Sequence, residues 1–335
     1  MGNVILIDPH PLPHFQTQSN PMTSRRNFLK TTGLATAALG LGLPSLSFAQ
    51  PGADLPFKIS LAEWSVNTLL FSKKLDHLDF ALTAKKHGIH AVEYVNQFFF
   101  DKAQDLTYLK EMNTRCTNEG ITQVLIMVDR EGMLGARDAA NRGKAVENHK
   151  KWIDAAKFLG CHTVRVNGYS DISWSTKQED AAEASKLVSD SIHQLATFAA
   201  PSGIHIVIEN HGGFSSNGKW LADTIRNANH PLAGTLPDFG NFRISTLDGK
   251  PVSYDSYRGV DELMPLATGV SLKPKVWDDA GQESDLDYKR MMKLVLSHGY
   301  NGHVGIEHGE KDREWESIVA IREILEGLQK PNALK

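Results

Sequence analysis

The sequence predicts an α/β protein with a single (β/α)8 barrel. Past residue 56, short β-rich runs alternate with longer segments whose apolar residues recur at three- and four-residue spacing, as in amphipathic helices. Eight such units fill roughly 270 residues, close to the about 250 that this barrel typically needs. The competing architecture is a doubly wound sheet, which usually shows a glycine-rich phosphate loop after its first strand. The segment LAEWSVNTLL (61–70) contains no glycine, so the barrel is favoured.

The elements follow in regular order along the chain. The predicted strands are 57–64, 89–95, 121–128, 162–167, 204–210, 232–238, 268–273 and 303–308. Helical periodicity is clearest in LDHLDFALTAKKHG (75–88), AVENHKKWIDAAKFLG (145–160) and AAEASKLVSDSIHQLATFAA (181–200). Glycines at positions 88, 120, 160 and 299 stand where helices commonly end. No linker or low-complexity tract interrupts these units, which indicates one domain over residues 50–335.

Residues 1–49 are predicted to be a leader and signal peptide. Arg25 and Arg26 precede a short apolar stretch (34–43), and SFAQ (47–50) offers a small-x-small cleavage site after Ala49. The paired arginines resemble the Tat export signal, which implies a folded protein delivered to the periplasm. The apolar stretch is short for a spanning helix, so no stable membrane insertion is expected after cleavage. An uncleaved anchor is the alternative.

Charge and cysteine content exclude several classes of function. The chain has 36 Lys and Arg against 39 Asp and Glu, a formal net charge of −3, and no basic cluster. This balance argues against nucleic acid or an anionic membrane as a partner. The two cysteines, Cys116 and Cys161, are too few for a disulfide framework and are expected to be buried thiols.

Four polar residues stand at the ends of predicted strands five to eight: Glu209, Asp238, Lys273 and Glu307. Successive members lie roughly 30 to 35 residues apart, about one β/α unit, so we expect them at similar height at the carboxyl-terminal mouth of the barrel. Three converging carboxylates repel one another unless a cation lies among them. The sequence therefore predicts that Glu209, Asp238 and Glu307 bind Mn²⁺ or Mg²⁺, or Zn²⁺ or Co²⁺ if a histidine joins them.

Other strand-end residues are expected to line the pocket and bind substrate. These are Trp64, Glu93, Arg165, Asn167 and Asn241. Glu93 and Arg165 could instead simply pair with each other. His211, beside a glycine pair, is interpreted as a metal ligand, an acid/base group or a loop histidine, and His205 as a core histidine.

The segments ENHGG, LPDFGNF, VSLK and GIEHGE together resemble the xylose-isomerase-like TIM barrels, often labelled sugar phosphate isomerases/epimerases. The resemblance implies one divalent metal ion, held by a Glu, an Asp, a His and a Glu on strands five to eight. Among the possible ions we expect Mn²⁺, because the predicted ligands are carboxylate oxygens. Glu209, Asp238 and Glu307 match three of these positions. Lys273 stands where the family commonly has the histidine. The metal would then have three protein ligands, or recruit His211 or water. The family also implies a possible homodimer.

In the epimerases of that family the two glutamates also move a proton beside a carbonyl, through an enediolate. The first hypothesis is therefore a metal-dependent isomerase or epimerase of a keto-sugar, with Glu209 and Glu307 catalytic. Lys273 would donate a hydrogen bond or a proton, or only neutralise the site. The second hypothesis is a 3-keto-glycoside 1,2-lyase, in which Lys273 or His211 protonates the departing aglycone. The third is a sugar-binding protein without turnover. In each case the partner is a small sugar or glycoside.

Overall fold

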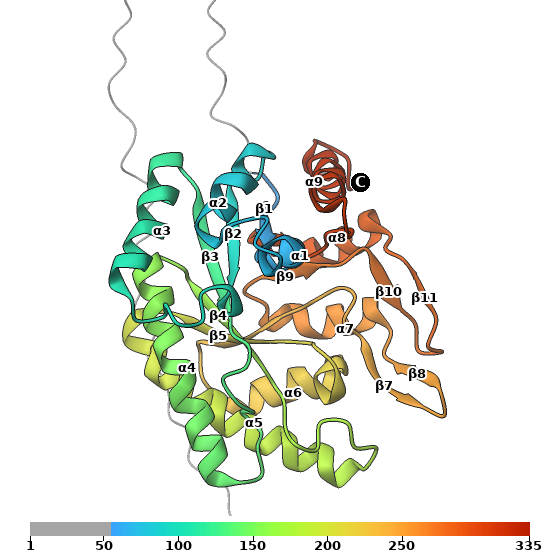
Figure 1. Ribbon diagram of the computed structural model, residues 1–335. Helices are drawn as coiled ribbons and strands as arrows, with labels where there is room; N and C mark the ends of the chain where they lie inside the picture. Colours follow the sequence, from blue (N-terminus) through green and yellow to red (C-terminus); the bar gives the residue numbers. More distant parts are fainter. Residues whose placement is uncertain (1–54) are drawn as a thin grey trace, which may run out of the picture. The chain divides into compact units, whose positions relative to one another are not determined.

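The computed structural model describes residues 55–335 and contains all eight predicted barrel strands (Figure 1). The predicted leader and its cleavage site lie outside the described residues. The barrel strands are β1 (Lys58–Ala62), β2 (Ala91–Val95), β3 (Thr122–Met127), β4 (Thr163–Asn167), β5 (His205–Glu209), β6 (Ala233–Leu236), β9 (Val270–Leu272) and β12 (His303–Ile306). Each lies within its predicted range, so the predicted barrel architecture is confirmed.

The strands form one parallel sheet that is nearly closed into a barrel. Their order is β6-β5-β4-β3-β2-β1-β12-β9, with β1 pairing with both β2 and β12. Two isolated parallel bridges, Thr235 with Ala267 and Asp238 with Ser271, join the β6 side to the β9 side. The Ser271 amide donates to the carbonyl of Pro237 at 2.9 Å. This closure brings strands five to eight around one mouth.

Helices alternate with the strands and cover the outside of the barrel (Figure 1). They are α1 (Asn67–Phe71), α2 (His77–Lys86), α3 (Leu106–Glu119), α4 (Ala139–Leu159), α5 (Gln178–Ala199), α6 (Gly218–Ala228), α7 (Ser256–Leu263), α8 (Tyr288–Ser297) and α9 (Glu314–Gln329). Gly120 and Gly160 end α3 and α4 with φ of 63° and 75°, the left-handed conformation that glycine adopts without strain.

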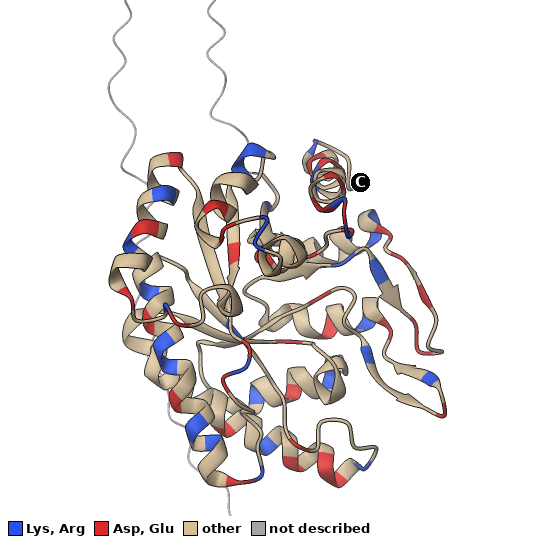
Figure 2. Cartoon of the chain, in the orientation of Figure 1, with Lys and Arg blue, Asp and Glu red and all other residues tan. Residues whose placement is uncertain are grey.

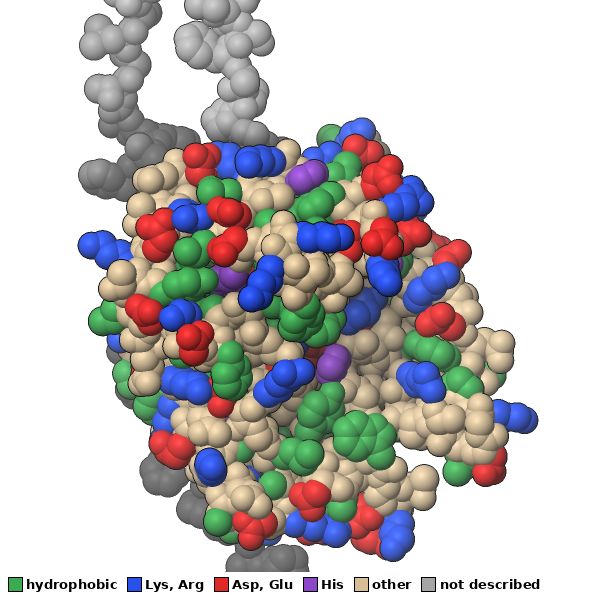
Figure 3. Space-filling model, viewed as in Figure 1, with side chains coloured by type: hydrophobic (Ala, Val, Ile, Leu, Met, Phe, Trp, Pro, Cys, Tyr) green, Lys and Arg blue, Asp and Glu red, His purple; other side chains and the backbone are tan. Residues whose placement is uncertain are grey.

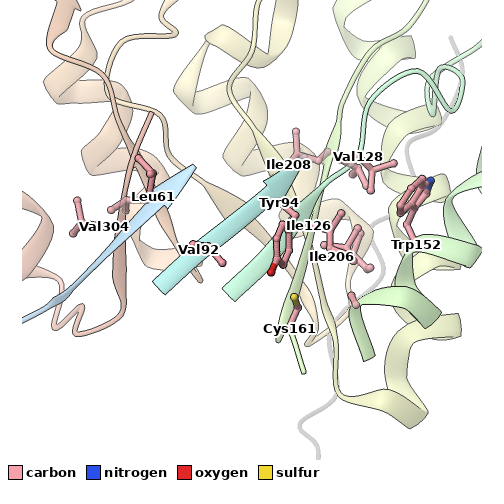
Figure 4. Close-up of a cluster of buried hydrophobic side chains, with 14 of the residues drawn as sticks. Leu61, Val92, Tyr94, Ile126, Val128, Trp152, Cys161, Ile206, Ile208 and Val304 are labelled. Carbon is pink, nitrogen blue, oxygen red and sulfur yellow. The ribbon is translucent and has the colours of Figure 1, made fainter. Parts of the chain in front are cut away.

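Alternation along the strands divides the core in two. On β5, Ile206 and Ile208 point outward and belong to the large cluster between the strands and the helices (Figure 4). Val207 points inward and belongs to a small cluster inside the barrel. Because side chains alternate with period two, Glu209 shares the inward face of Val207. The same parity places Asp238, Lys273 and Glu307 on the inner face of their own strands.

Two antiparallel hairpins interrupt the β/α repeat, and the sequence analysis did not predict them. They are β7 (Arg243–Leu247) with β8 (Lys250–Ser253), and β10 (Lys275–Trp277) with β11 (Glu283–Asp285). Figure 1 shows them side by side at one edge of the barrel. A Cβ atom at Gly281 would lie 2.7 Å from the carbonyl oxygen of Pro251, so the hairpins approach closely. Both follow strands that carry site residues.

Acidic and basic side chains are interspersed along the outer helices (Figure 2). None of the helices in residues 55–335 has the length and apolarity needed to cross a membrane. Cys116 and Cys161 are both buried and free, as expected. Burial raises the pKa of both thiols, which makes them poor nucleophiles.

Candidate active site

Three carboxylates converge at the carboxyl-terminal mouth of the barrel. Glu209 ends β5, Asp238 lies two residues after β6, and Glu307 follows β12 directly. Glu209 and Asp238 are fully buried, and Glu307 is 6% exposed. Each offers one oxygen, and these three oxygens lie within 4.8 Å of one another. The predicted convergence is therefore present, and this buried acidic triad could bind a metal ion.

A lysine lies among the same oxygens. The Nζ atom of Lys273 is 2.7 Å from Oδ2 of Asp238, 2.9 Å from Oε1 of Glu307 and 3.9 Å from Oε1 of Glu209. Burial would lower the pKa of Lys273, but the three carboxylates raise it above its ordinary value. The side chain is therefore a protonated ammonium, which has no lone pair for a metal.

The remaining carboxylate oxygens also have partners. The hydroxyl of Ser271 lies 2.9 Å from Oδ2 of Asp238 and 2.8 Å from Oε2 of Glu307. Oδ1 of Asp238 accepts from the amides of Gly240 and Asn241, both at 2.8 Å. These contacts hold the loop after β6 and the strand β9 in one arrangement. The sequence analysis did not single out Ser271, although it shares the inward parity of Lys273.

Glu209 is held by two further groups. The side-chain amide of Asn241 donates to Oε1 of Glu209 at 2.8 Å, and Nε of Arg165 lies 2.9 Å from its Oε2. Burial raises the pKa of Glu209 to about 8 even though the Arg165 guanidinium opposes the shift. Burial would also raise the pKa of Glu307, but Lys273 and Arg165 outweigh burial and lower this pKa. The two glutamates thus differ in their affinity for a proton.

Whether the residues fit a divalent ion depends on Lys273. A metal bound to the three carboxylates would lie where the Lys273 ammonium lies now. Two positive charges in one buried space repel strongly. The acidic triad provides oxygen ligands, but the fourth ligand position is occupied by the Lys273 ammonium, which competes with a metal ion. The residues therefore do not fit a metal ion unless Lys273 moves away.

Arg165 links the triad to a second group of polar side chains. One guanidinium nitrogen lies 2.8 Å from Oδ1 of Asp129, which also accepts from the amide of Asn167 at 2.7 Å. Burial would raise the pKa of Asp129, but Arg165 and these donors lower it to about 2. Sequence reasoning missed Asp129. It directly follows the predicted third strand (121–128), so the strand-end rule used for Glu209 would have found it.

Glu93 occupies a different level of the barrel. It is 2% exposed and accepts a hydrogen bond of 2.6 Å from the hydroxyl of Ser60. A Cβ atom at Gly305 would lie 2.6 Å from either carboxyl oxygen, so this glycine makes room for Glu93. Burial raises the pKa of Glu93 to about 7. It lies in the barrel interior outside the lining of the two cavities described next, and it does not pair with Arg165.

Two cavities open above the triad. The first, of about 480 Å³, is lined by Trp64, Gln97, Val128, Asp129, Arg130, Glu131, Gly132, Met133, His149, Arg165, Asn167, Tyr169, His211 and Glu307. The second, of about 520 Å³, is lined by His211, Gly212, Gly240, Asn241, Arg243, Lys273, Pro274, Lys275, Trp277, Glu283, Glu307 and His308. His211 and Glu307 line both. In the space-filling view the surface is hollowed near its centre, where a histidine and hydrophobic side chains meet (Figure 3).

The structure thus brings most of the predicted pocket residues together. Trp64, Arg165 and Asn167 line the first cavity, and Asn241 lines the second. The second cavity depends on the unpredicted hairpins, because Arg243 and Trp277 belong to β7 and β10. The site is therefore broader than its strand ends alone indicate.

His211 is held by Tyr169. The phenol of Tyr169 lies 2.5 Å from Nδ1 of His211 and 2.5 Å from its carbonyl oxygen. Burial, with Arg165 and Lys273 nearby, lowers the pKa of His211 to about 4. The imidazole is therefore neutral at pH 7 and is a weak candidate for a general acid. Tyr169 remains a phenol, since burial raises its pKa to about 12.

Comparisons with solved structures find the same fold. A 3-keto-D-glucoside 4-epimerase from E. coli aligns with 14% identity, covering 80% of this chain and 99% of that chain, with a TM-score of 0.58. A D-psicose 3-epimerase from Clostridium cellulolyticum H10, solved with D-tagatose, aligns with 13% identity, covering 82% of this chain and 100% of that chain, with a TM-score of 0.60. A xylose isomerase-like TIM barrel protein from Mycobacterium smegmatis, solved with magnesium, aligns with 16% identity, covering 83% of this chain and 98% of that chain, with a TM-score of 0.60.

A search of curated proteins found no match. Two family models match the sequence. The TAT (twin-arginine translocation) pathway signal sequence matches residues 22–42, which indicates export as predicted. The model described as xylose isomerase-like TIM barrel matches residues 82–330, from α2 to the end of α9 and through every site residue except Trp64. The chain therefore belongs to the family of xylose isomerase-like TIM barrels.

Proposed function

We propose that the protein is an exported, periplasmic enzyme that removes a proton from the carbon beside a carbonyl of a keto-sugar and returns it, as an isomerase or epimerase does. The observation that carries this proposal is the position of Glu307. It lines both cavities, and it is hydrogen-bonded to Lys273, which faces Glu209 on the far side. Glu307 at the cavity wall, with the Lys273 ammonium beside it and Glu209 buried behind it, supplies the base and the cation that proton transfer through an enediolate requires.

The roles follow from burial and charge. Glu307 reaches the cavity and accepts the proton from carbon. Glu209, buried behind Asn241 and Arg165, is the second carboxylate of the pair. Negative charge then develops on the carbonyl oxygen and must be balanced by a cation. The resemblance implies a divalent ion, Mn²⁺ in our expectation, in that role, and Glu209, Asp238 and Glu307 would hold it only if Lys273 moved away. The epimerases among the structural neighbours support the reaction class.

The second cavity favours one alternative, elimination of the aglycone from a 3-keto-glycoside. Both reactions begin with the same proton abstraction. The lyase additionally needs space for an aglycone beside the sugar, and Trp277 and Pro274 give the second cavity an apolar wall. The leaving oxygen also needs a donor, and the Lys273 ammonium, which the carboxylates hold protonated, lines that cavity as a hydrogen-bond donor. A neutral His211 fits this task less well.

The experiment is proton NMR in D₂O with the purified protein, a 3-keto-glucoside and a panel of free ketoses. Deuterium entering beside the carbonyl of an intact sugar establishes isomerase or epimerase chemistry, whereas aglycone release establishes the lyase. Glu307→Gln should slow either reaction by about 10²- to 10⁴-fold. The matched control is Glu310→Gln, an exposed carboxylate three residues away. Sugar binding without turnover in the unaltered protein would make it a binding protein.

A further inference from the structure

We propose that the Lys273 ammonium is the resident cation of this site and takes the place of the divalent ion, so that the protein works without a metal. The inference rests on the proposed proton-transfer function for its chemical consequence. Its structural part stands alone, because it concerns only which cation the three carboxylates hold.

The first argument is position. Protein carboxylates hold Mg²⁺ at about 2.0–2.1 Å. An ion at that distance from the facing oxygens of Asp238 and Glu307 would lie in contact with Nζ of Lys273, which is 2.7 and 2.9 Å from the same two oxygens. Ion and ammonium therefore exclude each other. The ammonium is joined covalently to β9 and is always present at this site, whereas an ion must be captured from solution.

The second argument is that the carboxylate oxygens already have partners. The triad has six carboxylate oxygens. One oxygen of Glu307 contacts Lys273 and the other contacts Ser271, whereas one oxygen of Asp238 contacts both Lys273 and Ser271. The other Asp238 oxygen accepts from backbone amides, and those of Glu209 face Asn241 and Arg165. A metal ion would have to displace several of these contacts. Lys273 and Arg165 also place two positive charges among the triad and Asp129.

The third argument is that the surrounding backbone makes room for the lysine. Gly240 lies in the loop that carries Asp238, and a Cβ atom there would lie 2.9 Å from Cβ of Lys273 and 2.8 Å from the carbonyl oxygen of Lys275. The same Cβ atom would lie 3.5 Å from Cδ of Lys273, so a side chain at position 240 would collide with the strand and contact the stem of the lysine. Loop and strand thus fit the lysine as it lies.

The ammonium can perform the electrostatic task of the ion. Two of its three N–H groups point to Asp238 and Glu307, and about a quarter of the side chain is exposed towards the second cavity. The third N–H can donate to the carbonyl oxygen of a bound keto-sugar. Glu307 then takes the proton from carbon, the C–H electrons form the enolate, and the oxygen gains negative charge beside the ammonium. Return of a proton from Glu307 to the same carbon restores the carbonyl and gives hydrogen exchange only. Epimerisation requires the proton to come from the second carboxylate, Glu209, after which Glu307 loses its proton to solvent and both groups are regenerated.

The decisive experiment is a Mn²⁺ titration of the chelator-treated full chain, followed by the EPR signal of free Mn²⁺. The unaltered protein should leave the signal unchanged at equimolar ion. Lys273→His replaces the ammonium by a neutral ligand and should bind one Mn²⁺ per chain, at least about 100-fold more tightly. Lys289→His, at an exposed lysine on α8, is the matched control and should bind none. Uptake of one Mn²⁺ per chain by the unaltered protein would overturn the proposal, even if Lys273→His fails to fold.

The second arm measures deuterium exchange on the keto-sugar that turns over. The unaltered protein should catalyse the exchange equally fast with chelator and with added Mn²⁺. Lys273→Met should lower the exchange rate by at least about 100-fold. Exchange that stops with chelator and returns with Mn²⁺ contradicts the inference but leaves the proposed function intact. If no preparation exchanges any sugar, the proposed function fails, and the titration still decides which cation the site holds.

Discussion

Arg165 is the residue that joins the two halves of the site. It is 4% exposed and lies between two carboxylates, Asp129 and Glu209, on the inner face of β4. A buried charge is tolerated only when its partners are in place, and removing one member leaves the others uncompensated. The wall of the first cavity formed by Asp129 and Asn167 therefore depends on this guanidinium.

We expect Arg165→Met to lower the free energy of unfolding by about 3–5 kcal/mol, because Asp129 and Glu209 would remain buried without their partner. Urea denaturation followed by circular dichroism measures the change. The control is Arg226→Met on α6, where a half-exposed arginine pairs with Asp223 and the loss should stay below about 1 kcal/mol. Equal losses in the two variants would show that the buried pair contributes no special stability.

At the scale of elements, the loop after β6 is held in place by α7. Phe242 is fully buried at the end of this loop, next to Asn241, and it lies directly against Gly259 of α7. A Cβ atom at Gly259 would lie 2.1 Å from the Phe242 ring. The close approach of a helix to this ring thus fixes the loop that presents Asp238 and Asn241 to the site.

Gly259→Ala should therefore destabilise the protein by about 1–3 kcal/mol, because the Phe242 ring has to move. Turnover should fall as well, since the loop moves with the ring. Thermal unfolding and the D₂O assay together check both effects. Gly143→Ala on α4 is the control: the space around it is open, so the helix should gain about 0.5–1 kcal/mol. A stabilising Gly259→Ala would contradict the proposed role of α7.

At the scale of the whole molecule, the two ends of the barrel have opposite chemistry. Carboxylates gather at the mouth, whereas His162, His205 and His303 lie at the amino-terminal ends of β4, β5 and β12. Lys58 lies near His162 and His303. Burial, with Lys58 and His162 nearby, lowers the pKa of His303 to about 4, and the pKa values of His162 and His205 are lowered too. His205 was expected to be a satisfied core histidine, but its Nδ1 has no hydrogen-bond partner among the described residues.

These histidines should make the barrel sensitive to acid. At about pH 8, well above the histidine pKa of about 6.5, they are neutral in both folded and unfolded chains and contribute no pH dependence. As the pH falls from about 6.5 to 4, the unfolded chain binds protons that the folded chain does not, so stability decreases. His303→Gln should reduce this loss by on the order of 1 kcal/mol, discounted for partial exposure. Urea denaturation of the unaltered protein and the variant at several pH values measures this difference. Buried glutamates such as Glu93 have raised pKa values and act in the opposite sense, but they are present in both proteins and their effect cancels in the difference.

The barrel and the acidic triad could be predicted from sequence because both depend on periodicity. Eight alternating units specify the strand order, and parity along each strand places Glu209, Asp238 and Glu307 on the inner face. The hairpins β7–β8 and β10–β11 were not predicted, since they insert short strands where the repeat suggested only connections. The second cavity was missed with them. Asp129 was missed although the same strand-end pattern marks it.

What the sequence by itself determined is which residues face the mouth, because period-two alternation and the spacing of the β/α units are local properties. Only the tertiary structure decided what these residues do to one another. The closure of β6 against β9 brings Lys273 within hydrogen-bond distance of Asp238 and Glu307. Charge balance inside a barrel depends on distances of a few ångströms between residues far apart in the chain. At these distances Lys273, which stands where the family commonly has a histidine, is a cation in direct contact with the carboxylates of the site.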